Sequence, residues 1–383
     1  MTVSYSGELL PPFLSDKFRF WAFVSMVLLV FVHGYTIEPR YLQPWTQPQD
    51  AMDFVSYTQY LLANGLLRFR IPMLFVISGF LFALHDAQPH RQRIRKRART
   101  LLLPYFLWSG FHLVLLYCME MEPTVRSWIA ANGINQMDEQ RLLLHDYHWY
   151  EAIGRWLLMP APYQLWFIRV LFFYNLAYPL LAGWLAHRTG RHIFFAVAIL
   201  AWLHSIHLYL FEAEGLLFFC LGVWMQKSGF NIETPSRWLR PHWWALVALM
   251  TALSKTWLAF QGQSLLGDAL FPLLMVLHKL TVFSGLVAAW YGSDALVRRC
   301  MAKPWFIWLS GFGFMIYALH APLVAILIDP ALQWAAPLPL PHLWVFILLP
   351  TALISMSIVV GFGLRRLAPS LYSLATGGRG LAP

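Results

Sequence analysis

The chain has 383 residues, of which 59% are apolar and only 12% are charged. Soluble domains average about half apolar and about a quarter charged residues, so this composition excludes an ordinary soluble enzyme and indicates an integral membrane protein. The formal charge of +10 does not indicate nucleic-acid binding, because the excess Lys and Arg lie in short loops between apolar segments and no RNA- or DNA-binding motif is present. Three scattered cysteines, Cys118, Cys220 and Cys300, have no metal-ligand spacing, so no metal site is predicted.

The first apolar segment, FRFWAFVSMVLLVFVHGY, carries an ionisable residue near each end. Arg19 and His33 are 14 positions apart, which is about 21 Å of helix and about 40° short of whole turns. Both side chains are therefore expected on one helix face, near opposite membrane surfaces, and Lys17 is expected on the other side of the helix.

Ten apolar segments come close to the length that a transmembrane helix requires. We expect an all-α polytopic membrane bundle of about ten transmembrane helices, forming a single membrane-embedded domain over residues 1–383. An outer loop is expected at about 119–163 and a cytoplasmic tail at about 365–383. The predicted helices are 18–36, 63–84, 101–118, 164–184, 192–210, 213–226, 242–260, 268–291, 304–326 and 342–364.

Basic residues support this arrangement, because every basic loop falls on the side that also holds both termini. The positive-inside rule assigns that side to the cytoplasm. The densest loop is RQRIRKRAR at 91–99, with six cations in nine residues. Such a run is typical of a topology determinant or a lipid-headgroup contact, and it fits the binding of an anionic cofactor equally well.

The ionisable residues within or beside the predicted helices gather in the outer half of the membrane. Charge at this depth is costly unless it is paired or faces water, so these residues are functional candidates. His33 could instead be an interfacial residue, and Arg169 could form a structural ion pair with Glu212 or Glu214. We assign no chemistry to His278 and Lys279. The candidates are His33, Arg68, Arg70, Arg169, Glu212, Glu214 and His320.

Five segments, in order, resemble acyltransferase family 3, the multi-pass membrane O-acyltransferases. They are the Arg19–His33 helix, RIPMLFVISGF at 70–80, KRARTLLLPY at 96–105, QLWFIRVLF at 164–172 and IYALHAP at 316–322. Two departures stand out. Thirteen residues separate Arg19 from His33, three more than is usual in the family, and Gln164 occupies a position where the family has His.

The resemblance implies transfer of an acyl group, by default acetyl, from cytoplasmic acyl-CoA to a hydroxyl of an outer-side carbohydrate or glycolipid acceptor. It also implies a bacterial inner (plasma) membrane protein, whose partners are the lipid bilayer, acyl-CoA and the acceptor, with no metal and no nucleic acid. The phosphates of acetyl-CoA require cations. We expect these from Arg19, Arg93, Lys96, Arg97 and Arg99.

On this interpretation His33 is the general base, and Arg70 or Arg68 stabilises the negative charge on the carbonyl oxygen. A covalent acyl-histidine relay is an alternative. The predicted substrate-binding residues are Trp166, Arg169, Glu212, Glu214, Tyr317 and His320. A transporter or flippase for a polar or anionic solute is the competing function, and a receptor or scaffold is a third.

Overall fold

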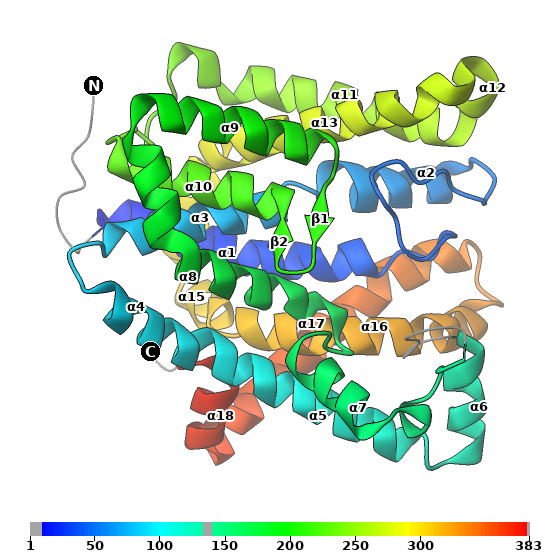
Figure 1. Cartoon of the computed structure of the whole chain (residues 1–383). Helices are drawn as coiled ribbons and strands as arrows, with labels where there is room; N and C mark the ends of the chain where they lie inside the picture. Colours follow the sequence, from blue (N-terminus) through cyan, green and yellow to red (C-terminus); the bar gives the residue numbers. More distant parts are fainter. Residues whose placement is uncertain (1–9, 133–139, 381–383) are drawn as a thin grey trace.

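The computed structural model describes residues 10–132 and 140–380. Long helices lie side by side along one axis and are joined by short connections (Figure 1). Over the described ranges the structure is nearly all-α, with one short β-hairpin. The longest helices are α1 (Pro12–His33), α3 (Arg70–Leu84), α5 (Leu103–Met119), α8 (Trp166–Ala186), α9 (Arg188–Leu203), α10 (Ala213–Lys227), α11 (Pro241–Gln261), α13 (Leu270–Gly292), α16 (Gly313–Ala335) and α17 (Pro341–Leu367).

Shorter elements connect these helices or extend them. The hairpin consists of β1 (His207–Leu208) and β2 (Phe211–Glu212), paired in antiparallel orientation. The short helices are α2 (Phe54–Leu61), α4 (His90–Arg97), α6 (Pro123–Asn132), α7 (Trp149–Leu157), α12 (Gln263–Leu266), α14 (Asp294–Met301), α15 (Pro304–Ser310) and α18 (Pro369–Thr376). Single turns of π- or 3₁₀-helix lie at 62–66, 98–102, 144–146, 163–165, 237–239 and 267–269.

Six helical stretches of the described chain are long and apolar enough to cross a membrane: Phe54–Leu84, His90–Met119, Tyr163–Ala186, Arg237–Gln261, Gln263–Gly292 and Pro341–Leu367. A seventh is added if α16 counts as one span, although its halves, Gly313–Ala321 and Leu323–Ala335, are bent by 65°. Every predicted apolar segment overlaps a long helix. The protein is therefore a multi-pass membrane protein.

Two predicted boundaries were wrong. The segment 192–210 was expected to be wholly helical, but α9 ends at Leu203 and the chain turns into the hairpin, with Ser205 at a positive φ of 48°. The ninth segment was expected to run unbroken over 304–326, but it consists of α15 and α16, and α16 continues to Ala335. The continuation keeps Asp329 in the helix, where Arg40 neutralises its charge at 2.7 Å.

Two helices organise the interior. α1 packs against α3, α16 and α17, and α3 packs against α10 over most of its length. The α3–α10 contact depends on glycine, because a Cβ on Gly79 would lie 2.0 Å from the Phe219 carbonyl oxygen and a Cβ on Gly222 2.1 Å from that of Val76. Only backbone fits in these spaces.

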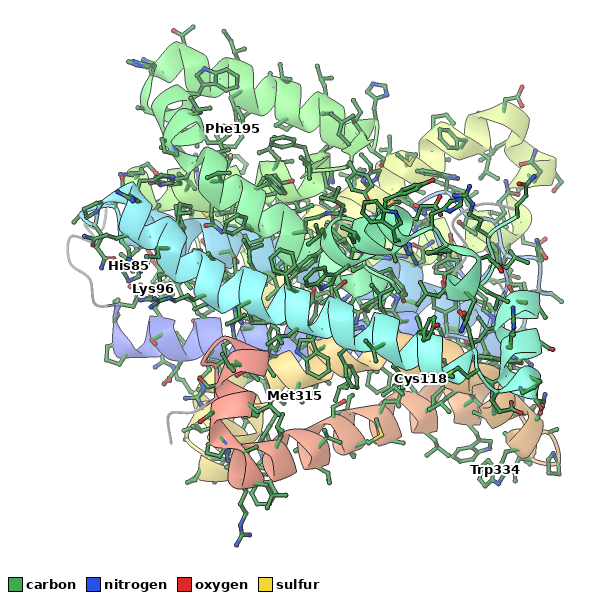
Figure 2. All side chains as sticks on the ribbon, turned by 60° about the horizontal axis from the view of Figure 1, so that its bottom comes forward. His85, Lys96, Cys118, Phe195, Met315 and Trp334 are labelled. Atoms are coloured by element: carbon green, nitrogen blue, oxygen red, sulfur yellow. The ribbon has the colours of Figure 1, made fainter. Side chains whose placement is uncertain are left out.

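The bundle has two chemically different ends. His85 and Lys96 lie at one end, close to α18, while Cys118 and Trp334 lie at the other (Figure 2). We call the first the basic end, because the 91–99 run lies there, and the second the distal end. The β-hairpin stops well short of the distal ends of α2, α11 and α13 (Figure 1).

Candidate functional site

His33 is the last residue of α1 and lies where two cavities meet. Its Nδ1 is 2.9 Å from the Tyr163 hydroxyl, with which it shares a hydrogen bond, and its ring centroid is 5.5 Å from that of His320. The chain leaves the helix beside α17, since a Cβ on Gly34 would lie 2.5 Å from Cγ of Pro350. The side chains of Tyr163 and His320 thus both contact the imidazole.

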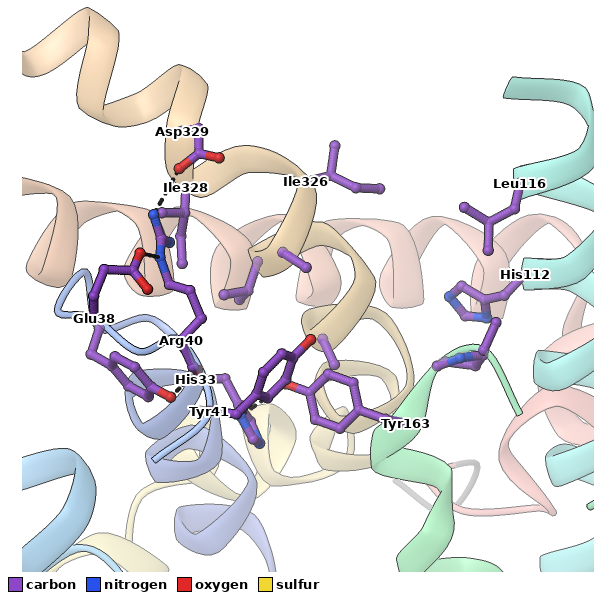
Figure 3. A pocket seen from close by; sticks show the side chains of 16 residues that line it. His33, Glu38, Arg40, Tyr41, His112, Leu116, Tyr163, Ile326, Ile328 and Asp329 are labelled. Carbon is purple, nitrogen blue, oxygen red and sulfur yellow. Dashed lines mark hydrogen bonds and ion pairs between the residues drawn. The ribbon is translucent and has the colours of Figure 1, made fainter. Parts of the chain in front are cut away.

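The first cavity, which we call the tyrosine cavity, is bordered by Tyr35, Tyr41 and Tyr163 and has a volume of about 230 Å³. The rings of Tyr41 and Tyr163 lie edge to face at 6.1 Å, beside His33 (Figure 3). Arg40 pairs with Glu38 at 2.6 Å and with Asp329 at 2.7 Å on the same wall. Aromatic rings beside charged hydrogen-bonding groups suit a polar ligand with apolar faces.

The second cavity, the arginine cavity, has a volume of about 470 Å³ and is bordered by Arg68, Arg70 and Arg169. His33 lines it as well, so the imidazole faces both cavities. Seven of the predicted site residues come together here, from α1, α3, α8 and the start of α10: His33, Arg68, Arg70, Trp166, Arg169, Glu212 and Glu214.

Backbone carbonyl groups hold two of these guanidinium groups. Arg68 donates to the carbonyl oxygens of Ala63 and Leu42, at 3.0 and 2.7 Å. Arg70 is 3% exposed and donates to the Leu67 carbonyl oxygen at 2.9 Å. Ala63 lies in the short π-helix at 62–66, so the acceptor for Nε of Arg68 is a carbonyl group of this π-helical turn.

The structure does not form the ion pair that was considered between Arg169 and the two glutamates. Arg169 donates to the Leu158 carbonyl oxygen and stacks over the Tyr209 ring at 4.5 Å. Glu212 instead caps α10, accepting hydrogen bonds from the backbone N–H groups of Glu214 and Gly215.

The two predicted residues of α16 lie deeper. His320 is fully buried, with Nδ1 beside carbonyl oxygens of its own helix, and its Nε2 has no hydrogen-bond partner within the described residues. Tyr317 is 2% exposed and donates to the Gln164 carbonyl oxygen at 2.6 Å. Tyr317 thus belongs to the core beneath the two cavities, because its polar atom is satisfied by the backbone.

A third cavity, the basic-end cavity, is bordered by Arg93, Lys96, Arg97 and Arg379 and has a volume of about 260 Å³. Arg379 comes from the C-terminal tail, donates to the Thr100 carbonyl oxygen at 2.9 Å and lies 4.9 Å from the Phe314 ring. Desolvation, and then the nearby Arg97, lower the pKa of Arg379 to about 10, so its charge persists at neutral pH.

Two predicted donor-binding residues lie outside this cavity. Arg99 is exposed and does not line it. Arg19 donates to the Ser310 hydroxyl at 2.7 Å and to the Ile307 carbonyl oxygen at 2.8 Å. Both ends of α1 thus contact the α15–α16 segment, as the helical spacing predicts, while Lys17 turns the other way and pairs with Asp294 at 2.5 Å.

Sequence reasoning missed three residues of these cavities. Tyr163 and Arg379 have no distinguishing sequence pattern, since one precedes a helix and the other lies in the tail. Lys279, to which no chemistry was assigned, lines the arginine cavity. Its position inside an apolar helix was the available signal. Within the described residues no group of three or more His, Cys, Asp or Glu has an arrangement that could hold a metal ion.

Comparison with known proteins identifies the family. Residues 15–360 match the acyltransferase domain that defines the acyltransferase 3 family. The chain is 26% identical over 368 residues to the succinoglycan biosynthesis protein ExoH of Rhizobium meliloti (strain 1021), covering 92% of this chain and 89% of that protein. No solved structure matches significantly. The chain belongs to the acyltransferase 3 family and is an O-acyltransferase.

Proposed function

We propose that this protein transfers an acyl group, by default acetyl, from cytoplasmic acyl-CoA to a hydroxyl of an outer-side carbohydrate. The observation that carries the proposal is the position of His33, which lines two cavities and is oriented by Tyr163. The similarity to a succinoglycan biosynthesis protein supports a polysaccharide or its glycolipid precursor as the acceptor.

The proposed topology has ten membrane spans in one domain, with the basic end and both termini in the cytoplasm. It is supported by the ten long helices within the described residues and by the clustering of Arg and Lys at one end. Since acyl-CoA is made in the cytoplasm, the proposed location is the bacterial inner membrane.

The basic-end cavity is the proposed site for the phosphates of the donor. Lys96, Arg97 and Arg379 supply the positive charge that phosphates need. α16 connects this cavity to His33. Near the start of the helix the Phe314 ring contacts Arg379, and further along the helix His320 stacks on His33. The six positions from Phe314 to His320 correspond to about 9 Å of helix. The acyl end of a bound CoA ester therefore has only a short distance to cover.

In the proposed reaction His33 acts as the general base through Nε2. The mechanism requires the tautomer in which Nδ1–H donates to the Tyr163 oxygen, 2.9 Å away, because this leaves the lone pair on Nε2 free to accept a proton. The acceptor oxygen attacks the thioester carbonyl carbon as it loses that proton, and the C–S bond then breaks. The proton passes from the imidazolium to the CoA thiolate. His33 is then neutral again, and CoA leaves as the thiol.

Arg70, supported by Arg68, is proposed to stabilise the carbonyl oxygen while it carries negative charge. Arg70 is buried and lines the same cavity as His33, so its charge acts with little screening by water. The acceptor sugar is assigned to the tyrosine cavity, where Tyr41 provides a ring face and Glu38 and Asp329 provide acceptors for hydroxyl groups.

The test is transfer of labelled acetyl groups from acetyl-CoA to surface glycan in membranes that contain the protein. His33→Ala is expected to lower kcat about 10²- to 10⁴-fold, and Arg70→Ala about 10²- to 10³-fold. His187→Ala is the matched control, because His187 is exposed and lies in none of the three cavities. Near-normal transfer by a folded His33→Ala protein would remove the proposed base.

A further inference from the structure

The arginine cavity carries more positive charge than the proposed reaction uses. Its lining includes four basic side chains, Arg68, Arg70, Arg169 and Lys279, and only two carboxyl groups, Glu212 and Glu214. A fifth basic residue, Lys255, is fully buried behind the wall, and its Nζ lies 3.0 Å from Nδ1 of His278, which itself lines the cavity.

The two carboxylates are occupied by other groups. Glu212 accepts hydrogen bonds from the Gly215 and Glu214 N–H groups at 2.5 and 3.2 Å, and it lies 3.7 Å from His207. Glu214 accepts from the indole N–H of Trp202 at 2.9 Å. Neither carboxylate forms an ion pair within 4.0 Å with a cavity arginine or lysine in the described part of the chain.

The basic residues, in turn, form no salt bridge within 4.0 Å of a carboxylate in the described part of the chain. The arginines bond to backbone carbonyl oxygens, and the Nε atoms of Arg70 and Arg169 have no hydrogen-bond partner within the described residues. Lys279 is 5% exposed, and its Nζ lies 5.1 Å from the Trp202 ring. Uncompensated charge at membrane depth costs several kcal/mol, so it is retained where it faces water or a ligand of opposite charge.

We propose that the arginine cavity binds a carboxylate group of a substrate, with Lys279 and Arg169 as the binding residues. This inference rests on the proposed function, which places the reacting bond at His33, on the wall of the same cavity. The donor phosphates are assigned to the basic-end cavity, which shares no lining residue with the arginine cavity, so they do not supply this charge. The carboxylate belongs either to the far end of the transferred acyl group or to an acidic sugar of the acceptor.

The experiment uses the full chain in membranes and measures kcat/KM for four substrate pairs. The donors are CoA esters of a four-carbon dicarboxylic acid and of the four-carbon monoacid of the same length. The acceptors are a neutral oligosaccharide and its counterpart containing a uronic acid. We compare the charged-to-uncharged ratio of kcat/KM in the wild type and in Lys279→Met, which removes the charge while keeping the length of the side chain.

If the acyl group carries the carboxylate, Lys279→Met lowers the ratio for the dicarboxylic donor roughly tenfold, with either acceptor. If the acceptor carries it, the ratio for the acidic acceptor falls instead, with either donor. Lys279→Arg is expected to restore most of the ratio, because it restores the charge. Lys303→Met, at an exposed loop position, is expected to leave it unchanged.

A ratio that Lys279→Met does not change, for both donors and both acceptors, overturns the carboxylate site while leaving the acyltransfer mechanism intact. Absence of wild-type transfer from all four pairs overturns this inference, and absence of transfer from acetyl-CoA as well overturns the proposed function. A uniform loss for charged and uncharged substrates alike also overturns the inference, since it shows that Lys279 supports the fold and not a charged ligand.

Discussion

The hydrogen bond between Tyr163 and His33 can be tested by removing a single oxygen atom, with Tyr163→Phe. The hydroxyl lies 2.9 Å from Nδ1, which is an ordinary distance for a hydrogen bond between neutral groups. Such a bond contributes about 0.5–1.5 kcal/mol. If it holds the imidazole in the reactive orientation, kcat is expected to fall about 2- to 12-fold. The ring itself remains, and with it the 5.2 Å contact to His33.

The assay is steady-state acyl transfer in membranes, with kcat and KM measured separately for donor and acceptor. The double variant His33→Ala/Tyr163→Phe is the decisive comparison, because a residue that acts only through His33 adds nothing once His33 is gone. Tyr163→Phe is therefore expected to lower kcat in the wild type and to have no effect in His33→Ala. A defect that persists unchanged in the double variant, or one confined to the acceptor KM, would refute the orienting role.

Three further outcomes follow from the contacts. Arg379→Gln is expected to raise the KM for acyl-CoA about tenfold at nearly unchanged kcat, because one charged contact to phosphate is lost; Arg299→Gln, exposed at the same end, is the control. Arg19→Gln is expected to lower the free energy of unfolding by about 1 kcal/mol without changing the donor KM, since Arg19 bonds to the α15 segment; a raised donor KM would return Arg19 to the donor site. Asp294→Asn is expected to destabilise the protein by about 1–3 kcal/mol, more than Lys17→Met does, because it leaves the buried ammonium group without its partner; thermal unfolding in detergent decides the order.

Much of the helical framework was predictable, because a segment that crosses a membrane must be apolar whatever its tertiary contacts are. The segments 242–260 and 268–291 correspond closely to α11 and α13 for this reason. The α9–α10 connection was not predictable. Its residues, from His204 to Glu212, are apolar enough to extend a helix, and only the pairing of His207 with Glu212 and the positive φ of Ser205 turn the chain back.

The candidate site was predicted better as a set of residues than as a division of roles. Arg68, Arg70, Arg169, Glu212 and Glu214 were singled out because charge at membrane depth is costly, and one cavity does bring them together. The same argument applied to Lys279, which was set aside because it lies in mid-helix, where no sequence pattern shows a cavity. Arg19 and Arg379 could not be distinguished by sequence, because the position of a tail relative to a bundle depends on packing.

The arrangement of α1 and α16 fixes the position of His33 at the end of α1. α1 is fixed to the α15–α16 segment at both ends, by Arg19 on Ser310 and by His33 beside His320. α16 is bent by 65° between Ala321 and Leu323, immediately beyond His320, so the helix departs from its straight path where the two cavities meet. In the proposed mechanism the acceptor approaches His33 beside this bend, from the distal end, and the same helix leads back to the basic-end cavity.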